Sequence, residues 1–222
     1  MHIAVIPARE GSKGLPFKNR MFFDMTADFI DTEAWFQQVI VSTDDDVIIE
    51  KATDRGYSVH HRTKDLSGDA VSIKSVFIAI INDLKISADA FLWLFYLPNL
   101  YKDPLDFRKA RDIMDKGEIV SLCGLVPAKT HPFNCYRYDG KTGELEQYVK
   151  NDVYRRQDLP DAWMLHHYVC CFRAKELNNL NNELVNNETY PFFIDRKTSD
   201  NLIEVDTPED YERWKSLSKE EK

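Results

Sequence analysis

The stretch IAVIPAREGSKGLPFKN, from Ile3 to Asn19, decides the fold. Its four leading residues are apolar, and they pass abruptly into a loop with two glycines, a serine and three cations, Arg9, Lys13 and Lys18. Glycine lets a backbone approach an anion closely, while free N–H groups and cations stabilise its charge. The stretch therefore predicts a buried first strand that opens into a phosphate-binding loop. Its spacing matches neither the Walker A nor the GxGxxG pattern.

Composition limits the remaining possibilities. A chain of 222 residues suits one domain over 1–222, and its net charge of −8 excludes a nucleic-acid partner with a basic face. No apolar run has the length of a membrane span, and Met1 leads directly into the first strand, so neither a span nor a leader is expected. The four cysteines form no CxxC motif, which predicts reduced thiols and a cytoplasmic protein.

Short apolar segments alternate with helical patterns. The expected strands cover 3–6, 39–42, 57–60, 91–96 and 119–122, and the expected helices cover 45–55, 71–84 and 104–116. Apolar strands without polar alternation are covered on both faces, so the fold class is α/β, with a Rossmann-like and mostly parallel sheet. Ligands of such sheets bind at the carboxyl ends of the strands, where the opening loop lies.

Boundaries of several helices follow from capping residues. Ser42 or Thr43 is expected to cap the helix at 45–55, and Asp103 with Pro104 suits the start of the helix at 104–116. The segment between Asn19 and Val39 is irregular, and it predicts at most a short helix at 32–38.

Five motifs in order carry a family resemblance. The opening motif PARxGSKGxxxKN resembles the signature of acylneuraminate cytidylyltransferases, which make CMP-activated nine-carbon acidic sugars. Four later segments resemble that family as well: VSTDD at 41–45, the loop at 62–72, RRQDLP at 155–160 and IEVDTPED at 203–210. The alternative for the opening motif is a solvated basic loop.

The resemblance implies a CTP site. Its phosphates would be held by Arg9, Lys13 and Lys18, and its nucleoside by Asn19 and Arg62. The implied nucleotide-binding set is Ala8, Arg9, Gly11, Ser12, Lys13, Asn19, Arg62 and Ser72, and the implied catalytic set is Arg9, Lys18 and Asp206. The alternative for the loop at 62–72 is a polar connection that caps the following helix.

Two acidic residues near the C-terminal end predict a metal site. Glu204 and Asp206 are two apart on an expected strand, so their side chains share one face. Paired carboxylates suit a hard divalent cation that bridges triphosphate oxygens, Mg²⁺ or Mn²⁺. Thr207 is expected to cap the last helix.

The sugar side departs from the family. Relatives carry a glutamine where Leu97 stands and an arginine where Met164 stands, while Asn99 can replace a threonine. Arg156 and Gln157 retain the family pattern, and an arginine there suits the sugar carboxylate. This combination predicts that N-acetylneuraminic acid is a poor substrate and a deoxygenated relative a better one. The adjacent pair His166 and His167 makes a weak metal site, because neighbours on a strand point opposite ways.

The segment 129–151 predicts an extended hairpin with a turn at Gly140. In the family such an excursion mediates a homodimer and reaches the partner's site. The expected function is CMP transfer from CTP to the anomeric hydroxyl of a nonulosonic acid, with release of pyrophosphate. Two alternatives remain open, namely transfer to another keto-acid sugar and a non-catalytic nucleotide-binding homologue.

Overall fold

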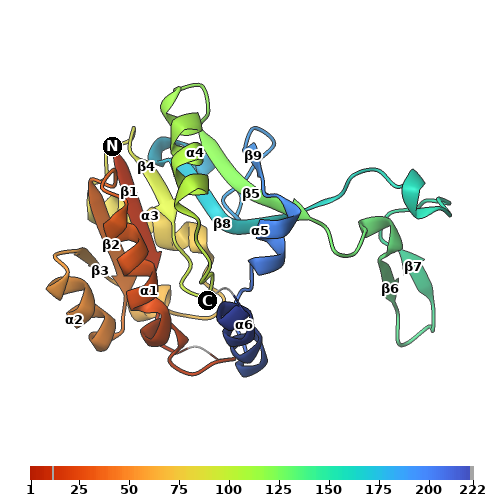
Figure 1. The fold of residues 1–222 in the computed structure, drawn as a ribbon, viewed down its shortest axis with the longest axis horizontal. Helices are drawn as coiled ribbons and strands as arrows, with labels where there is room; N and C mark the ends of the chain where they lie inside the picture. The colour runs from red at the N-terminus through yellow and green to blue at the C-terminus, as the bar shows by residue number, and fades with distance from the viewer. Residues whose placement is uncertain (12, 221–222) are drawn as a thin grey trace.

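The computed structural model describes residues 1–11 and 13–220. Its centre is a seven-stranded sheet in the order β3-β2-β1-β4-β8-β5-β9 (Figure 1). The strands are β1 (His2–Pro7), β2 (Gln38–Thr43), β3 (Ser58–His61), β4 (Phe91–Leu94), β5 (Ser121–Pro127), β8 (Trp163–Arg173) and β9 (Tyr190–Phe193). Only β8 runs antiparallel to its neighbours, so the predicted mostly parallel α/β fold is confirmed.

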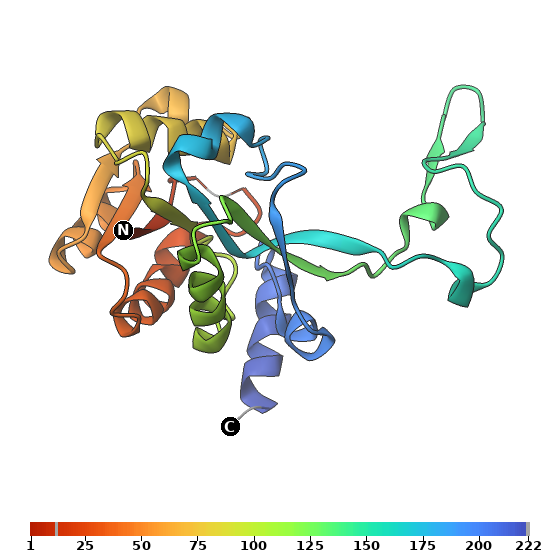
Figure 2. The same cartoon turned by 90° about the horizontal axis from the view of Figure 1, so that it is seen from above.

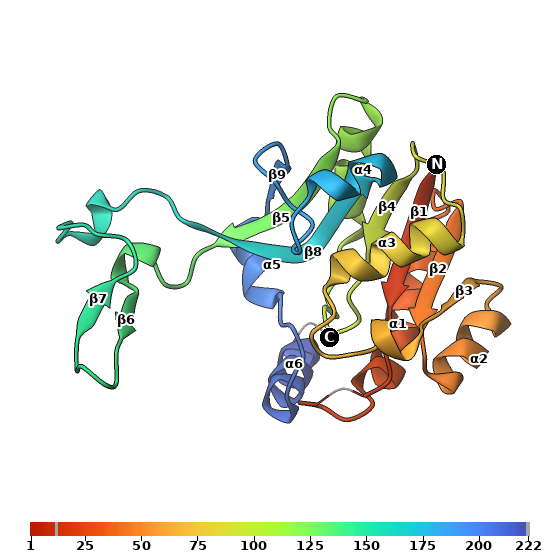
Figure 3. The ribbon, with the colours of Figure 1, turned by 180° about the vertical axis from the view of Figure 1, so that it is seen from behind.

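Helices cover both faces of this sheet. On one face lie α1 (Lys18–Thr32), α2 (Asp46–Asp54), α4 (Pro104–Asp115) and α6 (Pro208–Glu220), while α3 (Ile73–Asp83) and the 3₁₀ segment η4 (Ala174–Asn179) cover the other (Figure 3). A short helix, α5 (Arg196–Asn201), follows β9. All six residues of β1 are buried, and burial on both faces explains why Ile3 to Ile6 form an unbroken apolar run.

The connection from β1 to β2 corrects the sequence prediction. Instead of a short helix at 32–38, residues 18–32 form the full helix α1. Its buried positions include Phe22, Phe23, Ala27 and Ile30, which follow the period of one helical face. Aspartates between them hid this periodicity, and they lie on the exposed side where Arg55 pairs with Asp24, Asp28 and Asp31.

Capping residues set the other helix boundaries. Asp45, and not Ser42 or Thr43, caps α2, since its carboxylate accepts hydrogen bonds from the N–H groups of Val47 and Ile48. Asp103 caps α4 as predicted, with Leu105 N–H as donor at 2.9 Å. Thr207 likewise accepts a hydrogen bond from Asp210 N–H at 3.2 Å at the start of α6.

Residues 128–162 leave the body between β5 and β8 (Figure 2). They carry a small two-stranded sheet of β6 (Tyr136–Tyr138) and β7 (Leu145–Gln147), with the predicted turn between them. The described residues also form four 3₁₀ segments: η1 (Lys64–Leu66), η2 (Pro132–Asn134), η3 (Arg156–Asp158) and η4. Among the described residues, none of the helices has both the length and the apolar character needed to span a bilayer.

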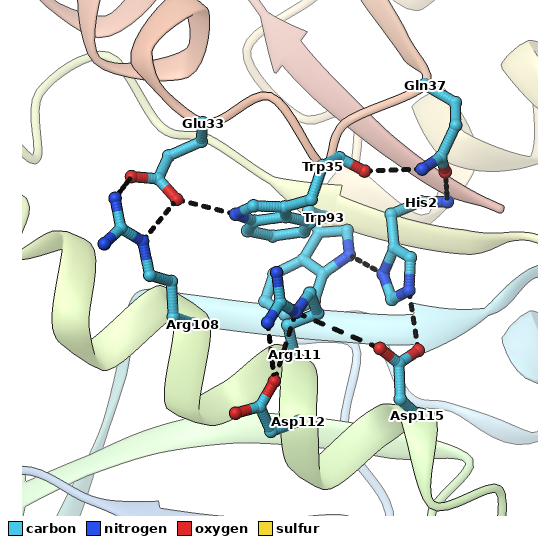
Figure 4. A network of polar contacts seen from close by, with 9 residues as sticks. All are labelled: His2, Glu33, Trp35, Gln37, Trp93, Arg108, Arg111, Asp112 and Asp115. Carbon is cyan, nitrogen blue, oxygen red and sulfur yellow. Dashed lines mark hydrogen bonds and ion pairs between the residues drawn. The ribbon is translucent and has the colours of Figure 1, made fainter.

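The amino end of the sheet is closed by a network of polar contacts (Figure 4). His2 Nε2 bonds to Asp115 of α4 at 2.8 Å, while His2 Nδ1 accepts a hydrogen bond from Trp93 Nε1 at 3.0 Å. Glu33, just beyond α1, accepts hydrogen bonds from Trp35 Nε1 at 2.6 Å and from Arg108 Nη2 at 2.8 Å. These bonds tie β1, β4, α4 and the loop before β2 together.

Candidate functional site: a basic pocket at the carboxyl end of the sheet

A pocket of about 310 Å³ opens where β1 ends. This volume lies within the range of small-molecule sites. Its polar wall comes from the opening loop and the start of α1, and its apolar wall comes from the loop and helix after β3. The lining residues are Pro7, Arg9, Lys13, Lys18, Asn19, Arg62, Leu66, Gly68, Asp69, Val71, Ile73, Val76, Tyr96, Pro98 and Glu204.

Backbone contacts hold the opening loop against the sheet. Ala8 N–H donates to Ser42 O at 2.8 Å, and the Thr43 hydroxyl donates to Ala8 O at 2.5 Å. Asn19 Nδ2 donates to Arg9 O at 2.8 Å, which fixes the loop to α1. The loop is therefore shaped by neighbouring strands and helices before any ligand binds.

Gly14 allows the loop to touch the C-terminal segment. A Cβ at this position would lie 2.3 Å from the backbone oxygen of Asp206. Because no side chain fits so close to a backbone atom, the glycine is required sterically. Through this contact the opening loop and the segment of Glu204 and Asp206 become walls of one site.

The start of α1 is built for an anion. Phe17 occupies the N-cap position with φ of 57°, and no side chain among the described residues caps the helix there. Lys18 lies in the first turn, where the helix dipole disfavours a cation. Uncapped N–H groups and an adjacent cation both gain from a bound phosphate, which makes this end a ready anion site.

Asp69 gathers two of the loop cations. Arg9 Nη1 lies 2.5 Å from its carboxylate, and Lys13 pairs with the same group. The hydrogen bond from Lys13, followed by that from Arg9, holds the pKa of Asp69 below its usual range. The pocket thus concentrates positive charge, with Asp69 as an exposed counter-ion between the two side chains.

Arg62 forms the inner end of the pocket. Its Nε donates to the Ser42 hydroxyl at 2.9 Å, and burial lowers its pKa to about 10. The guanidinium therefore remains protonated at neutral pH. Tyr96, which follows β4, also lines the pocket.

Glu204 and Asp206 share an exposed face, as predicted. Val205 between them is fully buried, while both carboxylates face outward. Glu204 also lines the pocket, and the partial burial of its side chain there, together with the negative charge of Asp206, raises its pKa. Lys18 bonds to Asp206, so the cations of the opening loop and the two carboxylates meet.

The structure thus brings together most of the predicted nucleotide site. Arg9, Lys13, Lys18, Asn19, Arg62 and Glu204 line one pocket, with Asp206 bonded to Lys18. Ala8 is buried behind the loop, and Gly11, with φ of 76°, shapes its turn. Ser72 caps α3 by accepting from Ser75 N–H at 3.1 Å and does not line the pocket. Ser12 lies outside the described residues.

The predicted sugar-side residues do not join this pocket within one chain. Asn99 is only 6% exposed and pairs with Glu204 in an isolated β-bridge. Its Oδ1 has no hydrogen-bond partner in the described part of the chain. Arg156 lines a separate hollow in the excursion, and Gln157 lies beside it in η3.

Two expectations about the sugar side need revision. Leu97 is fully buried in the hydrophobic core, so the prediction that it faces a bound sugar is wrong. Met164 is 46% exposed on β8, opposite Val126, and does not line the pocket. Among the pocket-lining residues that the sequence reasoning missed is Tyr96, whose signal in the sequence was its position directly after an apolar strand.

The fold is one that cytidylyltransferases share. A structure titled CMP:2-keto-3-deoxy-manno-octonic acid synthetase complexed with CTP aligns with a TM-score of 0.64 at 15% identity, over 100% of this chain and 99% of the other. A 4-diphosphocytidyl-2C-methyl-D-erythritol synthase from Anaerococcus prevotii aligns with a TM-score of 0.63 at 12% identity, over 98% of each chain.

The curated proteins that are similar in sequence are also named as cytidylyltransferases. N-acylneuraminate cytidylyltransferases of Streptococcus agalactiae, from serotypes III and Ia, are 24% identical over 217 residues. The alignment covers 94% of this chain and 51% of each relative, so the chain spans about half the length of the curated relatives it matches. No family model matches the sequence.

Proposed function

We propose that this protein transfers CMP from CTP to the anomeric hydroxyl of a 2-keto acid sugar of the nonulosonic type and releases pyrophosphate. The observation that carries the proposal is the pocket in which Arg9, Lys13 and Lys18 meet the carboxylates of Glu204 and Asp206. Its support is the similarity over 94% of the chain to N-acylneuraminate cytidylyltransferases.

The geometry suits displacement at phosphorus. Arg9, Lys13 and the start of α1 would bind the triphosphate, and Lys18 would neutralise charge on the leaving pyrophosphate. Arg62 and Tyr96 at the inner end would receive the nucleoside. During the reaction the sugar oxygen bonds to the α-phosphorus, the bond from the α-phosphorus to the oxygen that bridges it to the β-phosphorus breaks, and the hydroxyl proton passes to water. Alignment and charge neutralisation are then the protein's main contributions.

A divalent cation fits the paired carboxylates. Their donors are hard oxygens, and the pKa of Glu204 is raised by burial first and by the negative charge of Asp206 second, so the two carboxylates repel each other. Mg²⁺ or Mn²⁺ held by Glu204 and Asp206 would relieve that repulsion. When bound, such a cation supplies positive charge for the phosphate oxygens.

We propose further that the excursion forms a homodimer. Its hairpin exposes large apolar side chains, including Tyr138 at 68%, Leu145 at 66% and Tyr148 at 70%. A two-stranded sheet alone is marginally stable, and exposed apolar clusters mark interfaces. A partner's excursion would also bring Arg156 and Gln157 to a sugar carboxylate at the other pocket, since they do not reach their own.

Pyrophosphate release tests the proposed reaction. The purified chain is assayed with CTP, Mg²⁺ and separate acceptors: N-acetylneuraminic acid, a deoxygenated nonulosonic acid and an octulosonic acid. We expect release only with CTP and a nonulosonic acceptor. Release with the octulosonic acid alone would move the assignment to another keto-acid sugar. Binding of CTP without release for every acceptor would support the non-catalytic alternative.

A further inference from the structure

A second group of ligand-forming side chains lies on the neighbouring strands β5 and β8. Cys123 of β5 and Cys170 of β8 are buried, and His167 of β8 is partly exposed. One ligand atom from each of the three lies within 4.8 Å of the other two. Thiols and imidazole are the ligands that zinc prefers in proteins.

An irregularity in β8 creates this group. Cys123 pairs with Cys170, but the next residue, Gly124, pairs with His166. Residues 167–169 therefore bulge out of the β5 ladder, and such bulges re-aim side chains. In a regular strand His167 and Cys170 would point to opposite faces, because side chains alternate. Gly124 permits the bulge, since a Cβ there would lie 2.6 Å from the backbone oxygen of His166.

The adjacent histidines, His166 and His167, have different hydrogen-bond partners. His166 Nδ1 accepts from Tyr168 N–H at 3.1 Å, so that ring is bound to the backbone. His167 Nε2 bonds to the backbone oxygen of Glu183 at 2.9 Å and must donate its proton there. Nδ1 of His167 consequently keeps a lone pair. Metal-binding histidines are commonly oriented by such a bond from the other ring nitrogen.

We propose that Cys123, His167 and Cys170 bind a soft divalent cation, Zn²⁺, at a site separate from the carboxylate pair. Two thiolates with one Zn²⁺ and a neutral imidazole carry no net charge, so occupancy leaves no unpaired charge in the core. Three protein ligands leave a fourth position for water. Sulfur donors exclude Mg²⁺, which prefers oxygen.

The site adjoins the pocket through Tyr96. The Tyr96 ring meets the His167 ring edge to face, with centroids 5.5 Å apart. The His167 side chain is 13% exposed next to Glu183, which gives a cation a route from solvent. A bound cation would lock the bulge and hold the pocket wall formed by Tyr96. This inference does not depend on the proposed transferase reaction.

Cobalt(II) substitution tests the site. The full chain, reduced and freed of metal, is titrated with Co²⁺ and then with Zn²⁺ as competitor. We expect one Co²⁺ per chain with thiolate-to-cobalt absorption, its loss on adding Zn²⁺, and a higher melting temperature with Zn²⁺. Cys123→Ser and Cys170→Ser should each weaken Zn²⁺ binding by more than about 100-fold. This loss is larger than the one expected when a residue that only orients a metal ligand is removed.

Matched controls come from the other cysteines. Cys171, the neighbour of Cys170, is buried on the opposite face of the sheet, and Cys135 lies in the excursion. The control variants are therefore Cys171→Ser and Cys135→Ser. Both should retain the cobalt spectrum. If the buried serine variants do not fold, His167→Gln at the partly exposed ligand gives the same comparison.

Three results would overturn the proposal. The first is the absence of thiolate absorption in the wild-type chain. The second is an unchanged spectrum in the folded variants at Cys123, Cys170 or His167. The third is a disulfide between Cys123 and Cys170 in protein purified without reductant that persists in the presence of Zn²⁺, since this would make the pair a cross-strand bond.

Discussion

The two ends of the central sheet contrast sharply. At the carboxyl end the strands open into a pocket lined by cations, with an uncapped helix start and repelling carboxylates. At the amino end His2, Glu33 and their aromatic neighbours satisfy one another in a closed network (Figure 4). Like charges gather around a pocket at one end, and hydrogen-bonded partners pair with one another at the other end, so the proposed ligand binding and the stability of the fold depend on different ends of the sheet.

This separation follows from electrostatics. Like charges held together in a folded protein cost free energy, and they persist where a ligand of opposite charge repays the cost. Hydrogen-bonded partners that pair with each other need no ligand. Substitutions at the carboxyl end should therefore affect turnover, and substitutions at the amino end should affect unfolding.

The largest effect is expected for Lys18→Ala. Turnover should fall about 100- to 1,000-fold, because the cation stabilises charge that grows on the leaving group. The melting temperature should change little, since the side chain supports no apolar packing of the core. Lys116→Ala, an exposed lysine beyond α4, is the control and should leave turnover unchanged. If Lys18→Ala melts at a lower temperature but keeps normal turnover, the assignment of ligand binding to the carboxyl end and of stability to the amino end is wrong.

Glu33→Ala should have a smaller effect, and it should lower stability while leaving turnover unchanged. Its carboxylate is 1% exposed and holds both Trp35 and Arg108. Loss of these partners should lower the free energy of unfolding by about 1–3 kcal/mol. Urea unfolding measures this loss, and turnover per folded molecule should stay at the wild-type value. Glu33→Gln, which keeps the shape and an acceptor, should lose less.

The carboxylate pair should make metal binding depend on pH. Because the pKa of Glu204 is raised, protons compete with Mg²⁺ at a higher pH than for an ordinary carboxyl. As pH falls through that raised pKa, apparent affinity should decline by up to about tenfold per pH unit. In Glu204→Gln the affinity should be lower and this pH dependence should disappear. Equal pH profiles for both proteins would exclude Glu204 as a metal ligand.

The smallest effect concerns His2. Burial lowers its pKa in the folded state, and Trp93 occupies the lone pair of Nδ1. Below about pH 6.5 the unfolded chain binds a proton that the folded chain resists, so the stability that His2 contributes is lost as pH falls. Urea midpoints above and below that pH should differ more for the wild type than for His2→Asn. Turnover should not show the pH dependence of the urea midpoint.

The sequence predicted the carboxyl end better than the amino end for a physical reason. Arg9, Lys13 and Lys18 stand close together in one glycine-containing stretch, so the sequence alone could group these pocket-lining cations. The closed network joins His2 to Asp115 and Glu33 to Arg108, which are distant in sequence. Such pairing depends on the fold, and no local sequence pattern predicts it.

Leu97 illustrates a second limit. A substituted motif position suggested an altered sugar contact, but the side chain turned into the core. Which face a residue takes after a strand depends on how the following loop packs. The bulge that turns His167 toward Cys123 and Cys170 is hidden for the same reason, because it exists only in the register between β5 and β8.

Calorimetric titration of the pocket tests the central claim most directly. The wild-type chain is titrated with CTP, UTP, ATP and GTP in the presence of Mg²⁺, with Lys18→Ala as the pocket variant. The account predicts that CTP binds at least about tenfold more tightly than the other three, a difference of about 1.4 kcal/mol, and that the variant loses this binding. Equal affinity for all four nucleotides, or CTP binding unchanged in Lys18→Ala, would contradict it.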